Sequence, residues 1–310
     1  MTCQPDVNKY YALALDPIHV GTGGMRLGRV DMSIVREPGT NVPKIPGTSL
    51  SGAARTYAAM QEEGKFPHCA GQGQADTGRG YQGHCGRPDC PICVTFGFSK
   101  GDQGSFQGLA QFSDARLVFF PVHSLAGPVW VTCPDALKDL EIPGAEPEDH
   151  QVRVASGVKA SGRLNLGWLM LDVASNDFAL QDQVPNVPQD ILKHAVLVSN
   201  KMFGHIVNDN LEVRTSVSID PATGAAAERA LFTYEALPRA SVLYFEVVVS
   251  DPQFYKIGDK APLQNNGGKQ KVIKTVEKGL TLFESLGVGG MNTRGMGRLR
   301  VLNLSAGGAE

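Results

Sequence analysis

Residues 269–304 read KQKVIKTVEKGLTLFESLGVGGMNTRGMGRLRVLNL, and along them a helical pattern gives way to a glycine-rich loop and then to a strand. The helix is predicted over 269–286, because its apolar residues recur at helical spacing with lysine and glutamate opposite. That apolar stripe comprises Val272, Val276, Leu280, Phe283 and Leu286. The loop occupies 287–297 and the strand is predicted over 298–304. We expect this helix to cover one face of a sheet.

The rest of the chain also alternates between strand-like and helix-like stretches. Alternating or apolar runs predict further strands over 10–20, 30–36, 107–121, 128–133, 163–173 and 242–250. Helical spacing predicts helices over 49–61, with Thr48 or Ser49 as the N-cap, and over 188–208. A β-hairpin is predicted over 211–237. This order predicts an α+β protein with an antiparallel sheet covered by helices on one face, of ferredoxin-like or RNA-recognition type.

Composition restricts the possible classes of protein. The chain has 310 residues, enough for one large domain or two ordinary ones, and its 42% hydrophobic content excludes disorder as the global state. A net charge of −2 argues against a wholly basic nucleic-acid binder, although local basic surfaces remain compatible with it. No apolar run is long enough for a transmembrane helix, and the N-terminus lacks the features of a signal peptide. We therefore expect a cytoplasmic protein without a membrane partner.

Cysteines are clustered in the first third of the chain. Four of the six lie close together in sequence: Cys69, Cys85, Cys90 and Cys93. The last three form a C-x4-C-x2-C pattern, which is typical of a closed tetrahedral zinc site in a cytosolic protein. The fourth ligand would be Cys69, with His68 and His84 as alternatives. Cys3 and Cys133 have no such pattern, and we interpret them as a terminal thiol and a small buried residue.

Two glycine-rich loops carry arginines. The C-terminal loop precedes or contains Arg294, Arg298 and Arg300, which favours phosphate binding over a simple turn, although it is neither a P-loop nor a dinucleotide-binding fingerprint. The N-terminal loop, over 19–29, contains two arginines and is followed at once by Asp31. By itself such an aspartate is typical of a turn or a surface acid, and a lone histidine in such a loop is typically structural.

In combination, these motifs resemble the RAMP superfamily of CRISPR proteins, and most closely the backbone subunit of type III interference complexes. The segments that carry the resemblance are 19–23, 28–31, 34–37, 43–55, 113–125, 130–134, 214–237 and 289–297. Segments 113–125 and 130–134 are similar to the Cmr branch. The insertion over 65–95, whose last cysteine is Cys93 and which is followed by Phe96-Gly97, is similar to the zinc-binding insertion of the Csm branch. The chain therefore resembles a Cmr-like body with a Csm-like insertion, within a single domain over 1–310.

The resemblance implies a role for each motif. The helix start and the loop of 287–297 would contact guide RNA, and a thumb-like hairpin over 211–238 would wedge into the guide–target duplex. Asp31 would cut the complementary target RNA with Mg²⁺ or Mn²⁺, and Cys69, Cys85, Cys90 and Cys93 would hold structural Zn²⁺. The implied RNA-binding residues are His19, Gly21, Gly23, Arg26, Thr48, Ser49, Ser51, Arg55, Gly289, Gly290, Asn292, Thr293, Arg294 and Gly295. Ser51 departs from the family pattern, because it stands where a lysine is usual.

The resemblance also implies partners, and it leaves alternatives open. Expected partners are CRISPR guide RNA, complementary target RNA, other effector subunits and further copies of this chain along the guide. The same subunit without catalytic activity would be a pure RNA scaffold. A guide-processing endoribonuclease would require acid–base residues, for which His19 and His123 are the candidates. A zinc protein unrelated to CRISPR is the remaining alternative. The sequence does not distinguish whether Asp31 would act as a base or as a metal ligand.

Overall fold

The computed structural model describes residues 4–23, 30–71, 83–101, 104–180, 184, 186–264 and 267–304. Its strands are β1 Asp6–Ala14, β2 Lys44–Ile45, β3 Phe98–Gly101, β4 Gly104–Phe106, β5 Ala110–Phe112, β6 Ala115–Val122, β7 Val129–Thr132, β8 Gln151–Val154, β9 Arg163–Leu166, β10 Leu169–Ser175, β11 Ala195–Leu197, β12 Glu212–Ile219, β13 Ala226–Ala236, β14 Val242–Val249 and β15 Leu299–Val301. Its helices are α1 Gly47–Met60, α2 Pro91–Phe96, α3 Pro134–Lys138, α4 Gln189–Lys193, α5 Asn200–Asp209, α6 Gly268–Thr281 and α7 Phe283–Leu286, with short 3₁₀ turns η2 Pro252–Phe254 and η3 Asn292–Arg294. None of the helices in the described part is long and apolar enough to cross a membrane.

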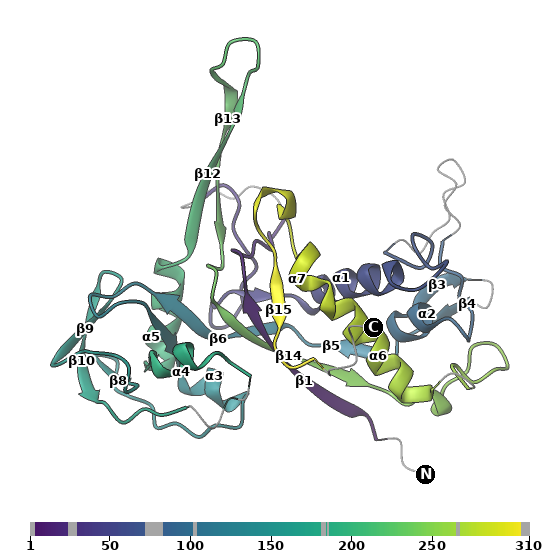
Figure 1. Cartoon of the computed structure of the whole chain (residues 1–310), viewed down its shortest axis with the longest axis horizontal. Coiled ribbons are helices and arrows are strands. Elements are labelled where there is room, and N and C mark those ends of the chain that lie inside the picture. Colours follow the sequence, from purple (N-terminus) through teal and green to yellow (C-terminus); the bar gives the residue numbers. More distant parts are fainter. Residues whose placement is uncertain are drawn as a thin grey trace.

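One sheet runs through the molecule in the strand order β15-β1-β14-β6-β7-β11-β8-β10-β9, with β2 and β5 attached to β6 and β14. The half that contains β1, β14 and β15 is antiparallel and is accompanied by α1, α2, α6 and α7 (Figure 1). The other half is accompanied by α3, α4 and α5, and it contains two parallel pairings, β7 with β11 and β8 with β10. The expected α+β fold is confirmed, but the sheet is not antiparallel throughout.

Helices α1 and α6 pack against each other at a glycine. A Cβ added to Gly279 would lie 2.2 Å from the carbonyl oxygen of Ala54, so only glycine allows this close approach. The predicted stripe of α6 is buried at Val272, Val276 and Leu280. The helix ends at Thr281 and α7 follows, which leaves Leu286 exposed rather than in the core.

The start of α1 differs from the prediction. The helix begins at Gly47, and Pro46 is its N-cap, so neither Thr48 nor Ser49 caps it. Instead, the backbone N–H of Gly47 donates to Asp114 Oδ1 at 2.8 Å, from the turn between β5 and β6. A side chain far away in the sequence therefore satisfies an orphan amide that a local cap would otherwise satisfy.

Four predicted elements are interrupted in the structure. The strand expected over 107–121 is two strands, β5 and β6. The strand expected over 163–173 is the hairpin β9–β10, because Gly167 adopts a φ of 64° and turns the chain. The helix expected over 188–208 contains strand β11 between α4 and α5, since a short apolar run fits both structures. The stretch 30–36 forms no continuous ladder. Its pairings are isolated ones, which join Met32 to Tyr234, Ile34 to Gly21 and Arg36 to Pro43.

The hairpin β12–β13 projects from the body as a long arm (Figure 1). It is a separate two-stranded sheet, in which Glu212 pairs with Ala236 at the base and Ile219 with Ala226 near the tip. Val217, Ile219 and Leu231 on this arm are exposed, so no core of the described chain covers them. The arm therefore presents apolar side chains to whatever lies beside it.

Candidate nucleic-acid interface

A groove lies between the start of α1 and the C-terminal glycine-rich loop. Its volume is about 350 Å³, and its lining is Ser49, Gly52, Ala53, Thr56, Tyr57, Gly287, Val288, Gly289 and Asn292. The Tyr57 hydroxyl donates to the carbonyl oxygen of Gly287 at 2.7 Å, which holds the loop against the helix. Thr48 is exposed at the same helix end, and Ser51 is half-buried. The structure thus brings the two implied guide-binding motifs together, although they are far apart in sequence.

The loop is fastened to the N-terminal segment through His19. The N–H of Gly290 donates to the carbonyl oxygen of His19 at 2.8 Å, and a Cβ on Gly289 would lie 2.5 Å from that oxygen. Gly289 has a φ of 88°, so glycine is required on both counts. His19 itself is buried, and its Nδ1 donates to the carbonyl oxygen of Glu235 at 2.7 Å. The imidazole of His19 is therefore a structural link and not a surface for RNA.

The three arginines in and after the C-terminal loop differ in whether they already form ion pairs within the chain. Arg298 donates to Asp16 at 2.6 and 3.0 Å, and Arg300 donates to Glu284 at 2.6 Å, so both are engaged within the chain. Arg294 is exposed and has no ion pair with any described residue. Gly289, Gly290, Asn292, Thr293 and Gly295 are exposed beside it. Of the three arginines that the sequence singled out, Arg294 is the one presented to a ligand.

Arg55 is a correction to the expected RNA surface. Its side chain is buried, with the residue 8% exposed. Nε donates to the carbonyl oxygen of Cys69 at 2.8 Å, and a terminal nitrogen donates to that of Gly97 at 2.7 Å. The guanidinium therefore joins α1 to the cysteine-containing insertion and is inaccessible to phosphate.

The N-terminal loop is only partly within the described residues. Gly21 and Gly23 belong to them, whereas Arg26 lies outside. Gly21 pairs with Ile34 and packs on His19, since a Cβ there would lie 3.1 Å from His19 Nε2. Gly23 has a φ of 75° and open space around it. The two glycines thus lead the chain from the buried histidine towards the surface.

Asp31 is bound to strand β13 of the hairpin. Its Oδ2 accepts from the backbone N–H of Thr233 at 2.7 Å and from the Thr233 hydroxyl at 2.9 Å. These bonds stabilise the ionised form and hold the pKa of Asp31 below its ordinary value. The described residues provide no donor to Oδ1. Asp31 therefore presents one fixed and one open carboxylate oxygen near the base of the projecting arm.

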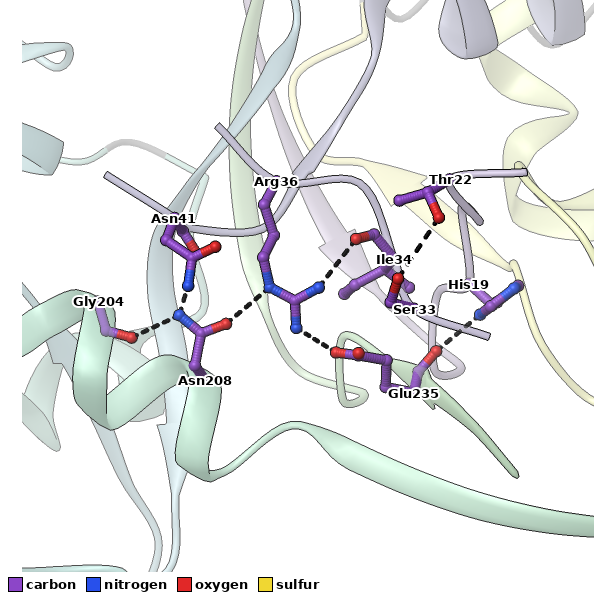
Figure 2. A network of polar contacts seen from close by, with 9 residues as sticks. All are labelled: His19, Thr22, Ser33, Ile34, Arg36, Asn41, Gly204, Asn208 and Glu235. Carbon is purple, nitrogen blue, oxygen red and sulfur yellow. Dashed lines mark hydrogen bonds and ion pairs between the residues drawn. The ribbon is translucent and has the colours of Figure 1, made fainter. Parts of the chain in front are cut away.

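A polar network supports the base of the arm next to this site (Figure 2). Arg36 forms an ion pair with Glu235 of β13, and its Nε donates to Asn208 Oδ1 at 2.8 Å. The Asn208 amide donates in turn to the carbonyl oxygens of Asn41 and Gly204. One arginine thus joins the 30–36 segment, the hairpin and helix α5, which fixes the hairpin at its root.

The cysteine cluster is the second candidate site. The Sγ atoms of Cys69, Cys85, Cys90 and Cys93 all lie within 4.8 Å of one another, with Cys85–Cys93 at 3.7 Å and Cys69–Cys90 at 3.9 Å. These separations are far longer than a disulfide and match the edge of about 3.8 Å that a Zn–S bond of about 2.3 Å gives in a tetrahedron. The fourth thiol is Cys69, whereas His84 Nε2 donates to the carbonyl oxygen of Ala70 at 3.1 Å. The four cysteines can hold a metal ion.

Sequence reasoning missed three residues of these sites: Asp114, Thr233 and Glu235. Each acts on a partner far along the chain, as Thr233 does on Asp31 across 202 positions. Thr233 and Glu235 lie in the predicted hairpin, but neither residue type in an alternating strand indicates a partner in the segment 30–36. Asp114 precedes a strand as an ordinary turn residue would.

Comparisons with known proteins agree with this architecture. The sequence profile of the RAMP superfamily matches residues 12–300. The CRISPR system Cmr endoribonuclease Cmr4 of Pyrococcus furiosus is 25% identical over 257 residues, which cover 76% of this chain and 79% of the relative. A chain of the type III-B Cmr-beta complex bound to cognate target RNA has a TM-score of 0.62 at 14% identity, covering 96% of this chain and 97% of that one. Oligomeric Cmr4 from Pyrococcus furiosus has a TM-score of 0.58 at 20% identity, covering 97% and 100%.

Proposed function

Since the chain belongs to the RAMP superfamily, we propose that it is a backbone subunit of a type III CRISPR interference complex that binds guide RNA and cuts complementary target RNA. The endoribonuclease activity for which the Pyrococcus furiosus relative is named and the cognate target RNA bound by the Cmr-beta complex support this assignment. The observation that carries the cleavage proposal is the placement of Asp31. Its carboxylate is fixed at the base of a projecting hairpin, where a strand displaced by the hairpin would pass.

Guide RNA would bind in the groove between α1 and the glycine-rich loop. In the first turn of α1, the Gly47 N–H already donates to Asp114 and the Ser49 N–H to the carbonyl oxygen of Pro46, so within the described residues the Thr48 N–H is the backbone donor left for phosphate. Thr48 and Ser51 add hydroxyl donors, and Arg294 adds a positive charge that the described residues leave unpaired. A hydroxyl at Ser51 provides no charge and the Asp114 carboxylate already caps the helix end, so Arg294 would supply most of the electrostatic attraction.

Target cleavage would use the 2′-hydroxyl of the RNA as nucleophile. If the arm bends the target strand, the 2′-oxygen can come into line with its own phosphate, which lowers the barrier by positioning. The 2′-oxygen would lose its proton to water and bond to phosphorus while the bond to the 5′-oxygen of the next nucleotide breaks. The products would be a 2′,3′-cyclic phosphate and a 5′-hydroxyl whose proton comes from water. The open Oδ1 of Asp31 would then face the reacting group. Because two donors hold Oδ2, the carboxylate is already ordered, and placing it for the reaction costs little further conformational entropy.

A divalent ion would assist at Asp31. Carboxylate oxygens are ligands that Mg²⁺ and Mn²⁺ prefer, and such an ion supplies stabilisation of the charge that develops on the phosphate. Within the described residues, Asp31 belongs to no group of three or more His, Cys, Asp or Glu side chains that could hold an ion by themselves. Asp31 would therefore provide one oxygen, while phosphate and water provide the rest.

The cysteine cluster would hold structural Zn²⁺. Four protein sulfurs complete a tetrahedron and leave no open position, which is typical of a structural rather than a catalytic site. Cys93 belongs to α2 and Cys69 accepts the bond from Arg55 of α1 through its carbonyl. The metal would thus stabilise the support of the guide-binding helix.

Self-association along the guide and contact with other effector subunits complete the proposal, in a complex that acts in the cytoplasm. The oligomeric Cmr4 structure supports self-association. A guide-processing nuclease is not favoured, because His19 is buried against Glu235 whereas His123 lies at a different turn, where its carbonyl binds Gly167. The pure scaffold remains an outcome of the test below.

The test is cleavage of target RNA by the guide-loaded complex, with wild-type and Asp31→Ala subunits compared in Mg²⁺ or Mn²⁺. We expect a regular ladder of products from the wild type and a loss of at least about 100-fold in rate for the variant, with target binding retained. Asp190→Ala is the matched control, since Asp190 is an exposed aspartate on α4. A wild-type complex that binds its target and leaves it intact would make this chain a scaffold.

A further inference from the structure

We infer that Thr233 is a positioning residue for Asp31, and that through it strand β13 of the projecting hairpin carries the cutting carboxylate. The inference rests on the proposed role of Asp31 and assigns the element that controls it. If so, one hairpin both contacts the target strand and positions the carboxylate that cuts it.

Three hydrogen bonds join the two residues. The Thr233 N–H and hydroxyl both donate to Asp31 Oδ2, at 2.7 and 2.9 Å. The same hydroxyl oxygen accepts from the backbone N–H of Asp31 at 3.1 Å. Thr233 thus binds the backbone and the side chain of Asp31 at once, so that neither the chain nor the carboxylate can rotate independently of β13.

The backbone around Asp31 follows the same strand. The N–H of Met32 donates to the carbonyl oxygen of Thr233 at 3.1 Å, and the N–H of Glu235 donates to that of Met32 at 3.2 Å. This is a short parallel pairing of Met32 with Tyr234, so the segment lies along the edge of β13. A displacement of β13 would therefore move Asp31 with it.

The two ends of the hairpin differ in their support. At the root, Arg36 connects Glu235 to Asn208 of α5 (Figure 2). Beyond Thr233, the side chains of Val217, Ile219 and Leu231 are exposed on the projecting arm (Figure 1). A bound strand would act on this outer part, and β13 would transmit its position to Thr233 and Asp31. A shift of about 1 Å in a reacting group is sufficient to slow a reaction by about 100-fold.

Thr215 provides a matched control on the neighbouring strand. Thr215 of β12 pairs directly with Thr233 in the ladder, so the two side chains share one face of the hairpin. Only Thr233 bonds to Asp31. Valine has the shape of threonine and a high preference for strands, so Thr233→Val and Thr215→Val make the same change on the two sides of one rung.

The experiment compares guide-loaded complexes that contain wild type, Thr233→Val, Thr233→Ser, Thr215→Val or Asp31→Ala. Single-turnover cleavage rates and target dissociation constants are measured for each. We expect Thr233→Val to cleave about 10- to 100-fold more slowly with target affinity within about twofold of wild type. Thr233→Ser keeps the hydroxyl and is expected to restore the rate to within about threefold, as is Thr215→Val.

The outcomes distinguish the positioning role of Thr233 from the catalytic role of Asp31 on which it depends. Slow cleavage by the valine variant, with rescue by serine, supports a positioning role, since a merely structural role would weaken target binding as well. The inference is overturned if Thr233→Val cleaves at the wild-type rate while Asp31→Ala is inactive. It is overturned too if Thr233→Ser is as slow as valine and both lose target affinity. Full activity of Asp31→Ala would reject the catalytic proposal itself.

Discussion

The cysteine cluster and the Asp31 site present their functional atoms in opposite ways. In the cluster, four sulfur atoms face one another and three of the four cysteines are fully buried. Asp31 is half-buried, with one oxygen bound to Thr233 and the other without a donor from the described residues. Closure suits a site that stabilises, because every ligand position is filled by the protein. An open carboxylate leaves room for a reactant, and its precision comes from the strand that holds it.

The largest expected effect comes from opening the closed site. Cys93→Ser should reduce bound zinc from one per chain to a small fraction, because a hydroxyl is a poor ligand for zinc in a sulfur site. Loss of the metal should destabilise the protein by about 4 kcal/mol and lower the melting temperature by about 8–16 °C. Elemental analysis and calorimetry test both. Cys133→Ser, a buried cysteine outside the cluster, should retain full zinc.

The next prediction compares two glycines of the long helices: Gly279 of α6, which is packed against α1, and Gly52 of α1, which has open space around it. Gly279→Ala forces a Cβ to within 2.2 Å of the Ala54 carbonyl oxygen, so we expect destabilisation by about 3–4 kcal/mol. Gly52→Ala is the control, because its Cβ would meet nothing within 4 Å. That variant should be slightly more stable, by about 0.5–1 kcal/mol. Equal melting temperatures for the two would contradict the tight crossing.

A smaller effect should follow from removing the brace at the hairpin root. Arg36→Ala leaves Glu235 buried without its cation, which should destabilise the protein by about 2–3 kcal/mol. Arg153→Ala removes an exposed pair with Asp177 and should leave the melting temperature almost unchanged. Denaturant unfolding measures the difference. If both substitutions behave alike, the network does not fix the arm.

The smallest expected effect is on RNA binding and comes from removing the exposed arginine of the C-terminal loop. Arg294→Ala should weaken guide RNA binding by about three- to tenfold and reduce the salt dependence of binding by about one phosphate contact. Arg298→Ala is the matched substitution, and it should affect RNA binding less because Arg298 is occupied by Asp16. Filter binding over a salt series would distinguish them. A larger loss for Arg298→Ala would show that its ion pair opens to bind RNA.

Features of the fold and the sites could be predicted from the sequence where the interacting residues are close together along the chain, and not where they are far apart. The cysteine pattern lies within a short stretch, and the structure confirms that its four thiols gather. The stripe of α6 and the strand of 242–250 were predictable for the same reason, since periodicity is local, whereas the strand expected over 107–121 is divided into β5 and β6. The helix start was misjudged, because Asp114 caps Gly47 from another part of the chain.

The remaining errors have a common physical cause. Arg55 stands in a motif that implied phosphate contact, but burial against Cys69 and Gly97 makes it a structural residue. The segment 30–36 looks like a strand because it alternates, although its three bridges lead to three different parts of the chain. Tertiary contacts decide both cases, and no local propensity encodes them.

The position of β1 in the sheet has a consequence for the synthesis of the protein. This first strand pairs with β14 and β15, whose residues are 242–249 and 299–301. While the chain emerges from the ribosome, β1 therefore has no sheet partner until residues 242–249 have been made. The bond from Gly290 to the His19 carbonyl forms later still. A nascent chain that stops short of this loop consequently lacks one wall of the groove between α1 and residues 287–297, in which we propose that guide RNA binds.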